Sequence, residues 1–371
     1  MADRIAFLLG KDPVISFGGD MTMFRNMRAI AAERYDTEVI CLSEEPDRTD
    51  SDPDFDIVRV AKPALSWTSL GRRSLLGRRS ALHVRFDVDG LRDAVEQSDA
   101  DRFVAVHCHL AEPYLRAAGA NPSRDLLVST EILESEIWPK IHGLPGRLEA
   151  PRLRRDENRV IGAARAVAGY DRDEMAGFQA RGIDARWLPM ALPPGPQSDV
   201  ASSPPRLVML GHRGWGPNAE AAETIVRIWP AIREGIPDAE LVLVGPPPDG
   251  PAAPLPDGVT DLGLVEDVDA ILGTARALTA PVGVGGGVRV KLLEAASRGI
   301  PAVCTTEAVG SIEAALGLSA APDEVGFVKH CRELLSDADA AAAEGAQLYA
   351  ANERFWNDRI GRDAVLDWLA V

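Results

Sequence analysis

The stretch that decides the fold is Ala280–Thr305, APVGVGGGVRVKLLEAASRGIPAVCT. A short apolar run ends before three glycines (285–287), and a helix is expected to begin near Val288. Gly299 and Pro301 follow in the order that ends a helix. The stretch therefore predicts a strand, a glycine loop, a helix and a second strand, as in a doubly wound α/β sheet.

The glycine loop and the helix after it form a candidate anion site. Glycines ahead of a helix let backbone N–H groups approach an anion, and the helix dipole favours negative charge there. Arg289 is expected in the first turn, and the spacing of Lys291, Glu294 and Arg298 places these three on one helix face. A ribose attached to a bound diphosphate would lie about 5 Å further along, within reach of Glu294. The alternative is a glycine-rich turn with a Lys291–Glu294 surface pair, which the three glycines and two clustered cations disfavour.

Outward from this stretch, short β-like runs alternate with helical patterns. Such runs are typical of buried parallel strands, and the intervening segments are long enough for helical crossovers. The strands expected are Ile5–Leu9, Glu38–Leu42, Phe103–His107, Leu126–Ser129, Ala166–Ala168, Leu207–Leu210, Leu241–Val244, Ala277–Ala280 and Ala302–Thr305.

The segment Pro189–Pro205 is dense in proline, serine and glycine, so no helix or strand is expected to continue through it. We therefore predict an α/β protein of two Rossmann-like, doubly wound domains. The first covers residues 1–190 and is joined by a C-terminal helix at 355–371; a linker at 191–205 leads to the second, at 206–354. The carboxyl ends of the two sheets are expected to face each other across a cleft.

Composition and charge narrow the function. The 371 residues are 46% hydrophobic and 26% charged, which excludes intrinsic disorder. There is no apolar run of 18 residues, no signal-peptide pattern at the amino terminus, and no close spacing among the four cysteines, so a cytoplasmic protein is expected. The net charge of −16 argues against a nucleic-acid partner, because a phosphate backbone needs a basic surface.

The acidity is interrupted at Ala61–Arg85, which holds six basic residues and no acidic one. This segment contributes +6 to the net charge of −16, which leaves −22 on the rest of the chain. Leucines and Trp67 are interleaved with the arginines, a composition that attracts phosphates or an anionic membrane surface. Weak peripheral membrane contact and acceptor binding through Arg72 and Arg73 are the functional alternatives. The commoner interpretation is a solvated arginine-rich loop whose leucines pack locally.

The pattern G-G-G-x-R-x-K-x-L-E-A followed by G-x-P resembles the donor-binding segment of retaining glycosyltransferases of family 4, within glycosyl transferases group 1. Residues 16–31, 106–115, 211–221 and 262–272 are similar to further segments of that family in order and spacing. The resemblance implies the GT-B fold and transfer of a sugar from a nucleotide-diphosphate donor to an acceptor hydroxyl. It implies no metal and no cofactor, since the nucleotide sugar is the substrate.

The resemblance also implies roles for individual residues. Arg289 and Lys291 match cations that face the donor diphosphate and stabilise it as it leaves. Glu294 matches a glutamate that hydrogen-bonds the nucleotide ribose, and His109 matches a histidine that lies near the donor sugar and assists the transfer. The other donor-binding residues that the resemblance implies are Gly18, Gly19, Arg213, Gly285, Gly286 and Gly287. One departure is Gly286, which stands where many members have a further glutamate.

Acidic residues supply acceptor-side candidates. Glu131, Glu134 and Glu136 follow the strand at 126–129 and are expected near the cleft, as is Asp20 in the first glycine loop. Glu131 and Asp20 are the candidates that we retain for binding acceptor hydroxyls. A solvated acidic helix start is the commoner interpretation of the three glutamates.

Two histidines flank Cys108 in the segment VHCHLAEPYL (106–115). Alternate residues at a strand end point to opposite faces, so His107, Cys108 and His109 are not expected to converge on a metal. One histidine is expected to face the core and the other the cleft. A core position for His109 is the structural alternative to its catalytic role.

Three other functions stay open. A degenerate GT-B protein would serve as a binding scaffold or partner, and the missing glutamate at Gly286 favours this alternative. A sugar-nucleotide epimerase would share the two-domain architecture and would need no acceptor. An NAD-dependent oxidoreductase would need G-x-G-x-x-G after the first strand, which the sequence GKDPVISFGGD does not match.

Overall fold

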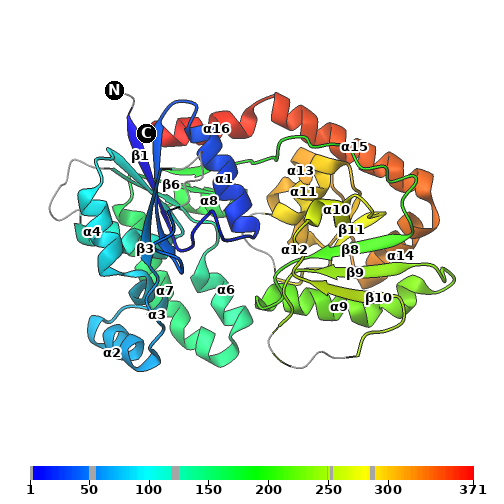
Figure 1. Cartoon of the computed structure of the whole chain (residues 1–371), viewed down its shortest axis with the longest axis horizontal. Helices are drawn as coiled ribbons and strands as arrows, with labels where there is room; N and C mark the ends of the chain where they lie inside the picture. Colours follow the sequence, from blue (N-terminus) through cyan, green and yellow to red (C-terminus); the bar gives the residue numbers. More distant parts are fainter. Residues whose placement is uncertain (1–2, 50–55, 118–124, 249, 251–253, 285–288) are drawn as a thin grey trace. The chain divides into compact units, whose positions relative to one another are not determined.

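The computed structural model describes residues 3–49, 56–117, 125–248, 250, 254–284 and 289–371. The chain divides into two compact units (Figure 1). Unit 1 comprises Met1–Leu188 and Arg362–Val371, and unit 2 comprises Pro189–Gly361. Both are doubly wound α/β units, which confirms the predicted fold class. No helix in the described part of the chain is both long and apolar enough to span a membrane.

Unit 1 is built on a seven-stranded sheet in the order β3-β2-β1-β4-β5-β6-β7, and every pair of neighbouring strands is parallel. The chain runs outward from β1 in one direction and from β4 in the other, so β1 and β4 form a switch point, where doubly wound sheets bind their ligands. The strands are β1 (Arg4–Leu9), β2 (Asp36–Ser43), β3 (Asp56–Ala61), β4 (Arg102–Val106), β5 (Asp125–Ser129), β6 (Ala166–Gly169) and β7 (Ala185–Trp187).

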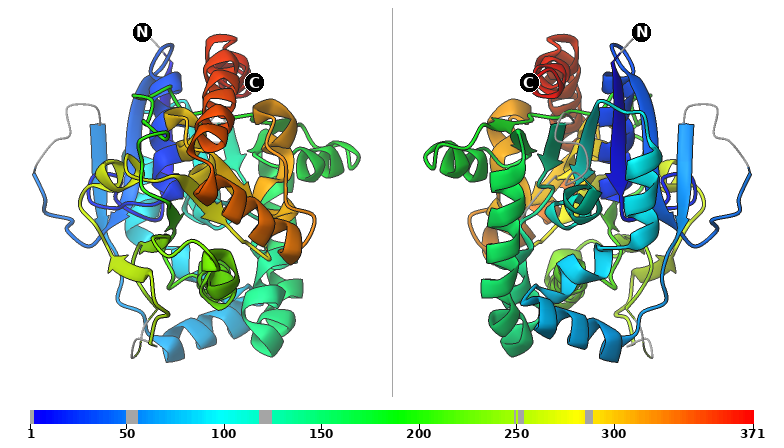
Figure 2. Two further views of the ribbon diagram at one scale, coloured as in Figure 1. Left: turned by 90° about the vertical axis from the view of Figure 1, so that its right-hand side faces the viewer. Right: turned by 90° about the vertical axis from the view of Figure 1, so that its left-hand side faces the viewer.

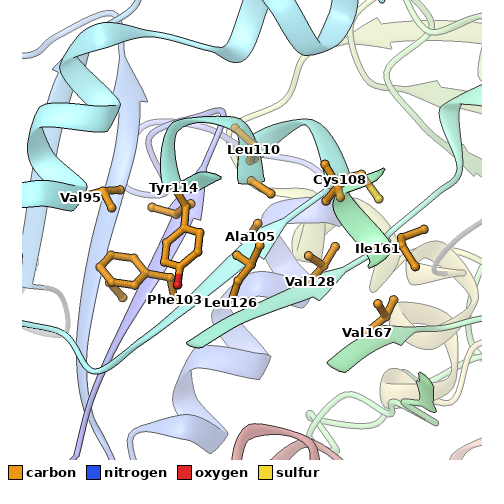
Figure 3. Packing of buried hydrophobic residues seen from close by; sticks show 14 of the residues in the cluster. Val95, Phe103, Ala105, Cys108, Leu110, Tyr114, Leu126, Val128, Ile161 and Val167 are labelled. Carbon is orange, nitrogen blue, oxygen red and sulfur yellow. The ribbon is translucent and has the colours of Figure 1, made fainter. Parts of the chain in front are cut away.

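Helices cover both faces of this sheet, with α1 on one side and α4 on the other (Figure 1). One core layer is shown in Figure 3, where Phe103 and Tyr114 pack with their ring centroids 5.2 Å apart. The helices are α1 (Gly19–Ala31), α2 (Trp67–Gly77), α3 (Ala81–Phe86), α4 (Asp89–Gln97), η1 (Cys108–Ala111), α5 (Glu112–Ala117), α6 (Glu134–Ile141), α7 (Gly143–Ala163), α8 (Arg172–Gln179) and the C-terminal α16 (Ile360–Leu369).

Unit 2 repeats the same winding on a five-stranded sheet in the order β10-β9-β8-β11-β12. Its switch point lies between β8 and β11. The strands are β8 (Arg206–Leu210), β9 (Glu240–Val244), β10 (Val259–Gly263), β11 (Ala277–Ala280) and β12 (Ala302–Cys304). The helices are α9 (Gly216–Arg233), α10 (Val268–Leu272), α11 (Val290–Arg298), α12 (Thr306–Val309), η2 (Gly310–Ile312), α13 (Glu313–Leu316), α14 (Glu324–Ser336) and α15 (Ala338–Asn357). In Figure 1, α9 and α14 lie on one side of this sheet and α10 and α11 on the other.

The nine predicted strands are all present, and the sequence analysis missed three more: β3, β7 and β10. All three are edge strands of their sheets. An interior strand such as β1 is covered on both faces and reads as an apolar run, whereas β10 is mostly exposed and contains Thr260 and Asp261. These exposed edge strands therefore lack the apolar signal that identified the others, whereas the edge strand β12 is buried and was predicted.

The proline-rich segment is not a free linker between units. It belongs to unit 2, whose boundary falls between Leu188 and Pro189. Tyr349 Oη donates to the carbonyl oxygen of Gly195 at 3.0 Å, and Asn352 Nδ2 donates to that of Leu192 at 3.0 Å. Side chains of α15 therefore hold the predicted linker, 191–205, along unit 2.

The C-terminal return to unit 1 is later than predicted. Helix α15 runs through Asn357 within unit 2, and the chain joins unit 1 only at Arg362, in α16. Arg362 Nε donates to Glu33 Oε2 at 2.8 Å, and Trp368 is fully buried. The predicted helix at 355–371 is therefore two helices that belong largely to different units.

Candidate functional site

The switch point of unit 2 brings two predicted motifs to one sheet edge. Gly211–Trp215 follows β8, and Pro281–Val284 follows the adjacent strand β11. Gly245, after β9, has a φ of +119°, and a side chain there would meet the Gly211 carbonyl oxygen at 2.2 Å. The three predicted diphosphate ligands Gly285, Gly286 and Gly287 lie outside the described residues.

Helix α11 begins at Val290, two residues later than predicted, so Arg289 is its N-cap residue and does not lie in the first turn. The helix ends as predicted, at Gly299 in the left-handed conformation with a φ of +69°. The Arg289 guanidinium lies over Gly310, where a Cβ atom would come within 2.5 Å of Nη2. Gly310 has a φ of +51°, so this position needs glycine both for its backbone and for the arginine above it. The sequence analysis missed Gly310.

Lys291 is the most informative side chain of this edge. Its Nζ donates to Asn218 Oδ1 at 3.0 Å, and Asn218 Nδ2 in turn donates to the His212 carbonyl oxygen at 3.1 Å. Burial lowers the pKa of Lys291 to about 8. Among the described residues, no carboxylate forms an ion pair with Lys291, so the expected alternative of a Lys291–Glu294 surface pair is absent there. Asn218 was missed because an asparagine near a helix start usually indicates a cap.

Glu294 lies one turn after Lys291 on α11. Burial raises the pKa of its carboxyl group, and the nearby positive charge of Arg298 acts in the opposite direction. Its side chain makes no hydrogen bond within the described part of the chain. The two side-chain hydrogen bonds at this residue, from Ser297 Oγ and Arg298 Nη1, go to its backbone carbonyl oxygen. The carboxyl group therefore remains able to accept or donate hydrogen bonds to a ligand. Arg298 instead forms an ion pair with Asp269.

Arg213, a predicted diphosphate ligand, is held inside unit 2. Its two terminal nitrogens each lie 2.6 Å from a carboxylate oxygen of Asp261, on the edge strand β10, and Nη2 also lies 2.6 Å from the Gly245 carbonyl oxygen. The guanidinium hydrogen bond holds the pKa of Asp261 below its usual value. Arg213 side-chain exposure is 5%. These contacts give Arg213 a structural role that ties two loops of this sheet edge together.

The switch point of unit 1 is occupied by the loop between β1 and α1. Gly18 caps α1 with a φ of +135°, and a Cβ atom there would lie 2.9 Å from Asp20 Oδ1. Asp20, in the first turn, forms an ion pair with Lys11 at 2.7 Å. The predicted residues Gly18, Gly19 and Asp20 therefore all lie at the start of α1, at the carboxyl end of β1.

A buried ion pair that the sequence analysis missed anchors this loop. Arg59 Nε, from β3, donates to Asp12 Oδ2 at 2.7 Å, and Ser43 Oγ donates to the same oxygen at 2.9 Å. Burial acts to raise the pKa of Asp12, but the hydrogen bonds from Val14 N–H, Arg59 and Ser43 hold it below its usual value. This network fixes the loop that leads to Gly18.

The two histidines do not alternate between core and cleft as predicted. Strand β4 ends at Val106, and the chain turns at His107, whose φ is +89°, into η1. The rings of His107 and His109 are stacked with centroids 5.2 Å apart. Cys108 is the residue that enters the core, beside Val128 and Ile161 (Figure 3). Residues two apart point the same way in an extended strand, and the turn at His107 keeps that arrangement, with the two rings together and Cys108 on the other side.

Burial keeps both imidazoles neutral. It lowers the pKa of His107 to about 4, opposed by the charge of Asp20, and lowers the pKa of His109 well below its usual value. His109 is packed against Phe86, with centroids 4.4 Å apart, and against His83. His107, in contrast, interacts electrostatically with Asp20 and Lys11 of the glycine loop. Of the two histidines, His107 is the one nearer the charges of that loop.

Glu112, the residue directly after η1, binds His83, whose ring lies against that of His109. Its buried carboxylate forms an ion pair with Arg79 Nη2 at 2.6 Å, hydrogen-bonds His83 Nδ1 at 2.6 Å and accepts from Arg159. Burial acts to raise the pKa of Glu112, but these partners hold it below its usual value. The sequence analysis did not single out Glu112, and assigned Arg79 to the exposed basic segment.

Glu131 is not part of a solvated helix start. It lies after β5 with a φ of +32°, and α6 begins only at Glu134. Ser129 Oγ donates to Glu131 Oε1 at 3.2 Å. Burial raises the pKa of Glu131 to about 8, so the group is mostly protonated at neutral pH. Of the three glutamates, Glu136 alone is exposed.

The remaining acceptor-side candidates, Arg72 and Arg73, lie on α2, well after β3. Arg73 Nη2 donates to the Asp87 carbonyl oxygen at 3.0 Å, and Arg72 is exposed. Neither contacts a residue of the β1–α1 loop among those described. No cluster of three or more metal-ligating side chains occurs in the described ranges. His107, Cys108 and His109 therefore do not form one.

Known proteins share this architecture. Residues 204–337 match a family model described as Glycosyl transferases group 1. A sucrose-phosphate synthase from Thermosynechococcus elongatus is similar over 98% of this chain and 97% of its own, with a TM-score of 0.73 and 16% identity. HepE from Anabaena, solved with UDP and glucose, is similar over 99% and 98% of the two chains, with a TM-score of 0.65 and 12% identity.

A Listeria monocytogenes protein described as a UDP-N-acetylglucosamine 2-epimerase is also similar, over 98% of this chain and 94% of its own, with a TM-score of 0.56 and 14% identity. None of the curated proteins compared by sequence matches the chain. Identities this low establish the fold alone, whereas the family model concerns the sequence of unit 2. The chain therefore has the two-domain GT-B fold, and its second unit contains a Glycosyl transferases group 1 domain.

Proposed function

We propose that this protein is a retaining, family 4-type glycosyltransferase that moves a sugar from a nucleoside diphosphate donor to an acceptor hydroxyl without a metal ion. The observation that carries the proposal is Lys291. This lysine lies at the switch point of the matched domain with an amide beside it and no ion-paired carboxylate among the described residues. Lys291 is half-buried, and a partly desolvated cation without a counter-ion destabilises the fold, a cost that an anionic ligand offsets.

Unit 2 supplies the donor site in this proposal. Lys291 and Arg289 face the diphosphate, together with backbone N–H groups of the glycine loop at 285–287. Glu294 accepts hydrogen bonds from the ribose, for which its carboxylate has unused acceptors. HepE, with its bound UDP and glucose, supports a nucleoside diphosphate sugar as the class of donor.

The transfer step forms a bond between the acceptor oxygen and the anomeric carbon of the donor sugar. The bond from that carbon to the diphosphate breaks, and its electron pair goes to the diphosphate oxygen. Lys291 and Arg289 stabilise the negative charge that develops there, and these fixed cations support a metal-independent reaction. The acceptor proton passes to the leaving oxygen.

Unit 1 supplies the acceptor side. Gly18 and Gly19 approach the diphosphate, His109 assists at the donor sugar, and Asp20 and Glu131 bind acceptor hydroxyls. An inverting reaction would need a general base opposite the leaving group. Glu131 is mostly protonated at neutral pH and so is not available as a base, Asp20 is already paired with Lys11, and His107, with a pKa of about 4, is a weak base. This supports attack from the side of the leaving diphosphate, which retains the anomeric configuration.

The test is a titration with nucleoside diphosphates of different bases, followed by thermal unfolding. One base should raise the unfolding temperature in proportion to the logarithm of its concentration. Lys291→Met and Glu294→Gln should each reduce that shift, while Lys329→Met, at an exposed lysine paired with Glu333, should leave it unchanged. Full nucleotide affinity in both site variants would overturn the proposed donor site.

An epimerase is the second candidate because the Listeria protein shares the fold over nearly the full length of both chains. Incubation with a sugar nucleotide labelled in the sugar separates the alternatives. A transferase passes the label to an acceptor or slowly to water, an epimerase returns a changed donor, and a scaffold leaves the donor intact. The anomeric configuration of the product and the rate in the presence of EDTA test retention and metal independence.

A further inference from the structure

The exposed apolar side chains of unit 1 are concentrated on two neighbouring helices. Among the described residues, fourteen large apolar side chains are well exposed, and six of these lie within Leu65–Leu76 and Leu144–Leu148. Helix α2 contributes Trp67 at 74% exposure and Leu76 at 79%. The six side chains are Leu65, Trp67, Leu75, Leu76, Leu144 and Leu148.

Helix α2 is docked through a polar contact rather than an apolar stripe. Ser74 is the sole buried residue of this fully described helix. Arg152 Nη1, on α7, donates to Ser74 Oγ at 3.2 Å, which places α2 beside the first half of α7 (Figures 1 and 2). Leu148 and Leu144 lie one and two turns before Arg152 on α7. The leucines of the two helices therefore belong to one region of the surface.

Cations border this region, and four of them form no ion pair with any described residue: Arg72 and Arg78 at α2, and Lys140 and Arg147 at the α6–α7 turn. The segment 61–85 carries +6 in a chain whose remainder carries −22. Most arginines elsewhere in unit 1 have carboxylate partners, Arg59 with Asp12 and Arg116 with Asp87 among them. Unpaired cations in an acidic protein therefore gather beside its exposed leucines.

We propose that this surface, made of α2 and the α6–α7 turn, docks on an anionic phospholipid bilayer. Trp67 and the leucines would enter the interfacial region while Arg72, Arg78, Lys140 and Arg147 meet lipid phosphates, as in interfacial amphipathic helices. The four cations without ion pairs beside the leucines select this occupant, because lipid phosphates are anionic and the lipid interface is apolar. A second copy of the chain is the alternative that the test separates. The proposal does not depend on the proposed enzymatic function.

The experiment is sedimentation of the full chain with vesicles of phosphatidylcholine, or of phosphatidylcholine and phosphatidylglycerol in equal parts. Binding should require phosphatidylglycerol and decrease with added salt. Each cation near such a surface contributes roughly fivefold to partitioning, so Arg72→Glu with Arg78→Glu should lower binding by at least about 25-fold. Trp67→Ser with Leu76→Ser should lower it by at least about tenfold.

Matched controls use exposed residues outside this surface that form no ion pair in the described structure. Arg34→Glu with Arg354→Glu tests charge alone, and Val325→Ser with Leu255→Ser tests apolar exposure alone. Both control pairs should bind vesicles like the unchanged protein. Equal losses in controls and surface variants, or no preference for phosphatidylglycerol, would overturn the proposal. So would a dimer in solution that the Trp67→Ser and Leu76→Ser variant abolishes, because the apolar surface would then be an interface between copies.

Discussion

Units 1 and 2 wind their central strands in the same order, yet their switch points carry opposite chemistry. In unit 2, Lys291 lies beside an amide, with Arg289 at the start of the same helix. In unit 1, the corresponding edge holds Glu131 and His107, which burial keeps largely neutral. The shared fold supplies the position of a site, and the side chains at the strand ends decide which charge it presents.

The two sheet edges also share one structural feature, a buried or partly buried arginine–aspartate ion pair. Each fixes its loop with an arginine–aspartate pair that bridges to an edge strand: Arg59 of β3 with Asp12 in unit 1, and Arg213 with Asp261 of β10 in unit 2. The pair in unit 1 is more deeply buried, with Asp12 at 1% exposure and Asp261 at 27%. The two units therefore differ in how deeply the pair that holds the loop is buried, as well as in the charge of the site.

The largest effect is expected from removing one partner of these pairs. Asp12→Ala should lower the free energy of unfolding by about 3–5 kcal/mol, because it leaves the Arg59 guanidinium buried and unpaired. Asp261→Ala should cost less, about 2–3 kcal/mol, since solvent reaches that pair. Urea unfolding measures both. Asp99→Ala, at an exposed ion pair with Arg4, is the control and should change stability by less than about 1 kcal/mol. Equal small losses at Asp12 and Asp261 would show that these pairs do not hold the loops.

The second-largest effect is expected from removing a cation at the sheet edge of each unit. Lys291→Met should lower kcat/KM for sugar transfer by about 10²–10³-fold, as expected for loss of a group that stabilises developing charge. The matched change in unit 1, Lys11→Met, should cost less than about tenfold, because Lys11 is already paired with Asp20. Lys291→Met should unfold no more easily than the unchanged protein, since it removes a half-buried charge that has no ion-pair partner among the described residues. A larger loss at Lys11 than at Lys291 would reverse the assignment of the two units.

A smaller effect should appear as pH dependence of donor affinity. A bound diphosphate stabilises protonated Lys291 and raises its pKa from about 8. Affinity should therefore be constant below pH 8 and fall by up to about tenfold per pH unit above it. Calorimetric titration with an intact sugar nucleotide between pH 7 and 9.5 measures this. Lys291→Arg, which stays charged, should bind with no such decline; a decline that persists in this variant would assign it to another group.

The smallest effect is expected at Glu131 in unit 1. Glu131→Gln should change the transfer rate at pH 7 by less than about threefold, because the carboxyl group is already mostly neutral there. The raised pKa means that the folded state holds a proton that the unfolded state has lost, so Glu131 reduces stability as pH rises from about 4.5 towards 8. Urea midpoints at pH 5.5 and pH 8 should differ less in Glu131→Gln than in the unchanged protein. An unaltered difference would show that Glu131 is ionised in the fold.

Much of the fold was readable from the sequence because interior parallel strands are covered on both faces and must be apolar. Eight interior strands and the buried edge strand β12 were predicted in this way, whereas the edge strands β3, β7 and β10 are more exposed, carry polar residues and were missed. The position of Lys291 and Glu294 on α11 was likewise predictable from helical spacing. The point at which the C-terminal segment returns to unit 1 was not predictable. A helix break at Asp358–Arg359 separates two apolar patterns that look continuous in the sequence.

The side-chain partners depended on contacts between residues far apart in the chain. Nothing near Arg213 in sequence indicates that Asp261 would engage it, and nothing near Lys291 indicates Asn218. The same holds for Arg79, which was expected to be a surface cation and instead pairs with Glu112. Local patterns report which residue types are present, and only packing reports which of them remain available for a ligand.

By itself, the sequence determined the α/β class, the glycine–cation–glutamate order at 285–294 and the basic segment in an acidic chain. These follow from spacing, composition and charge, which are local or additive properties. The tertiary structure decided that Lys291 lacks a carboxylate partner in the described part of the chain, that Arg213 has one, and that Glu131 is buried and mostly protonated. Burial and pairing depend on which distant elements meet, and therefore they exist only in the folded chain.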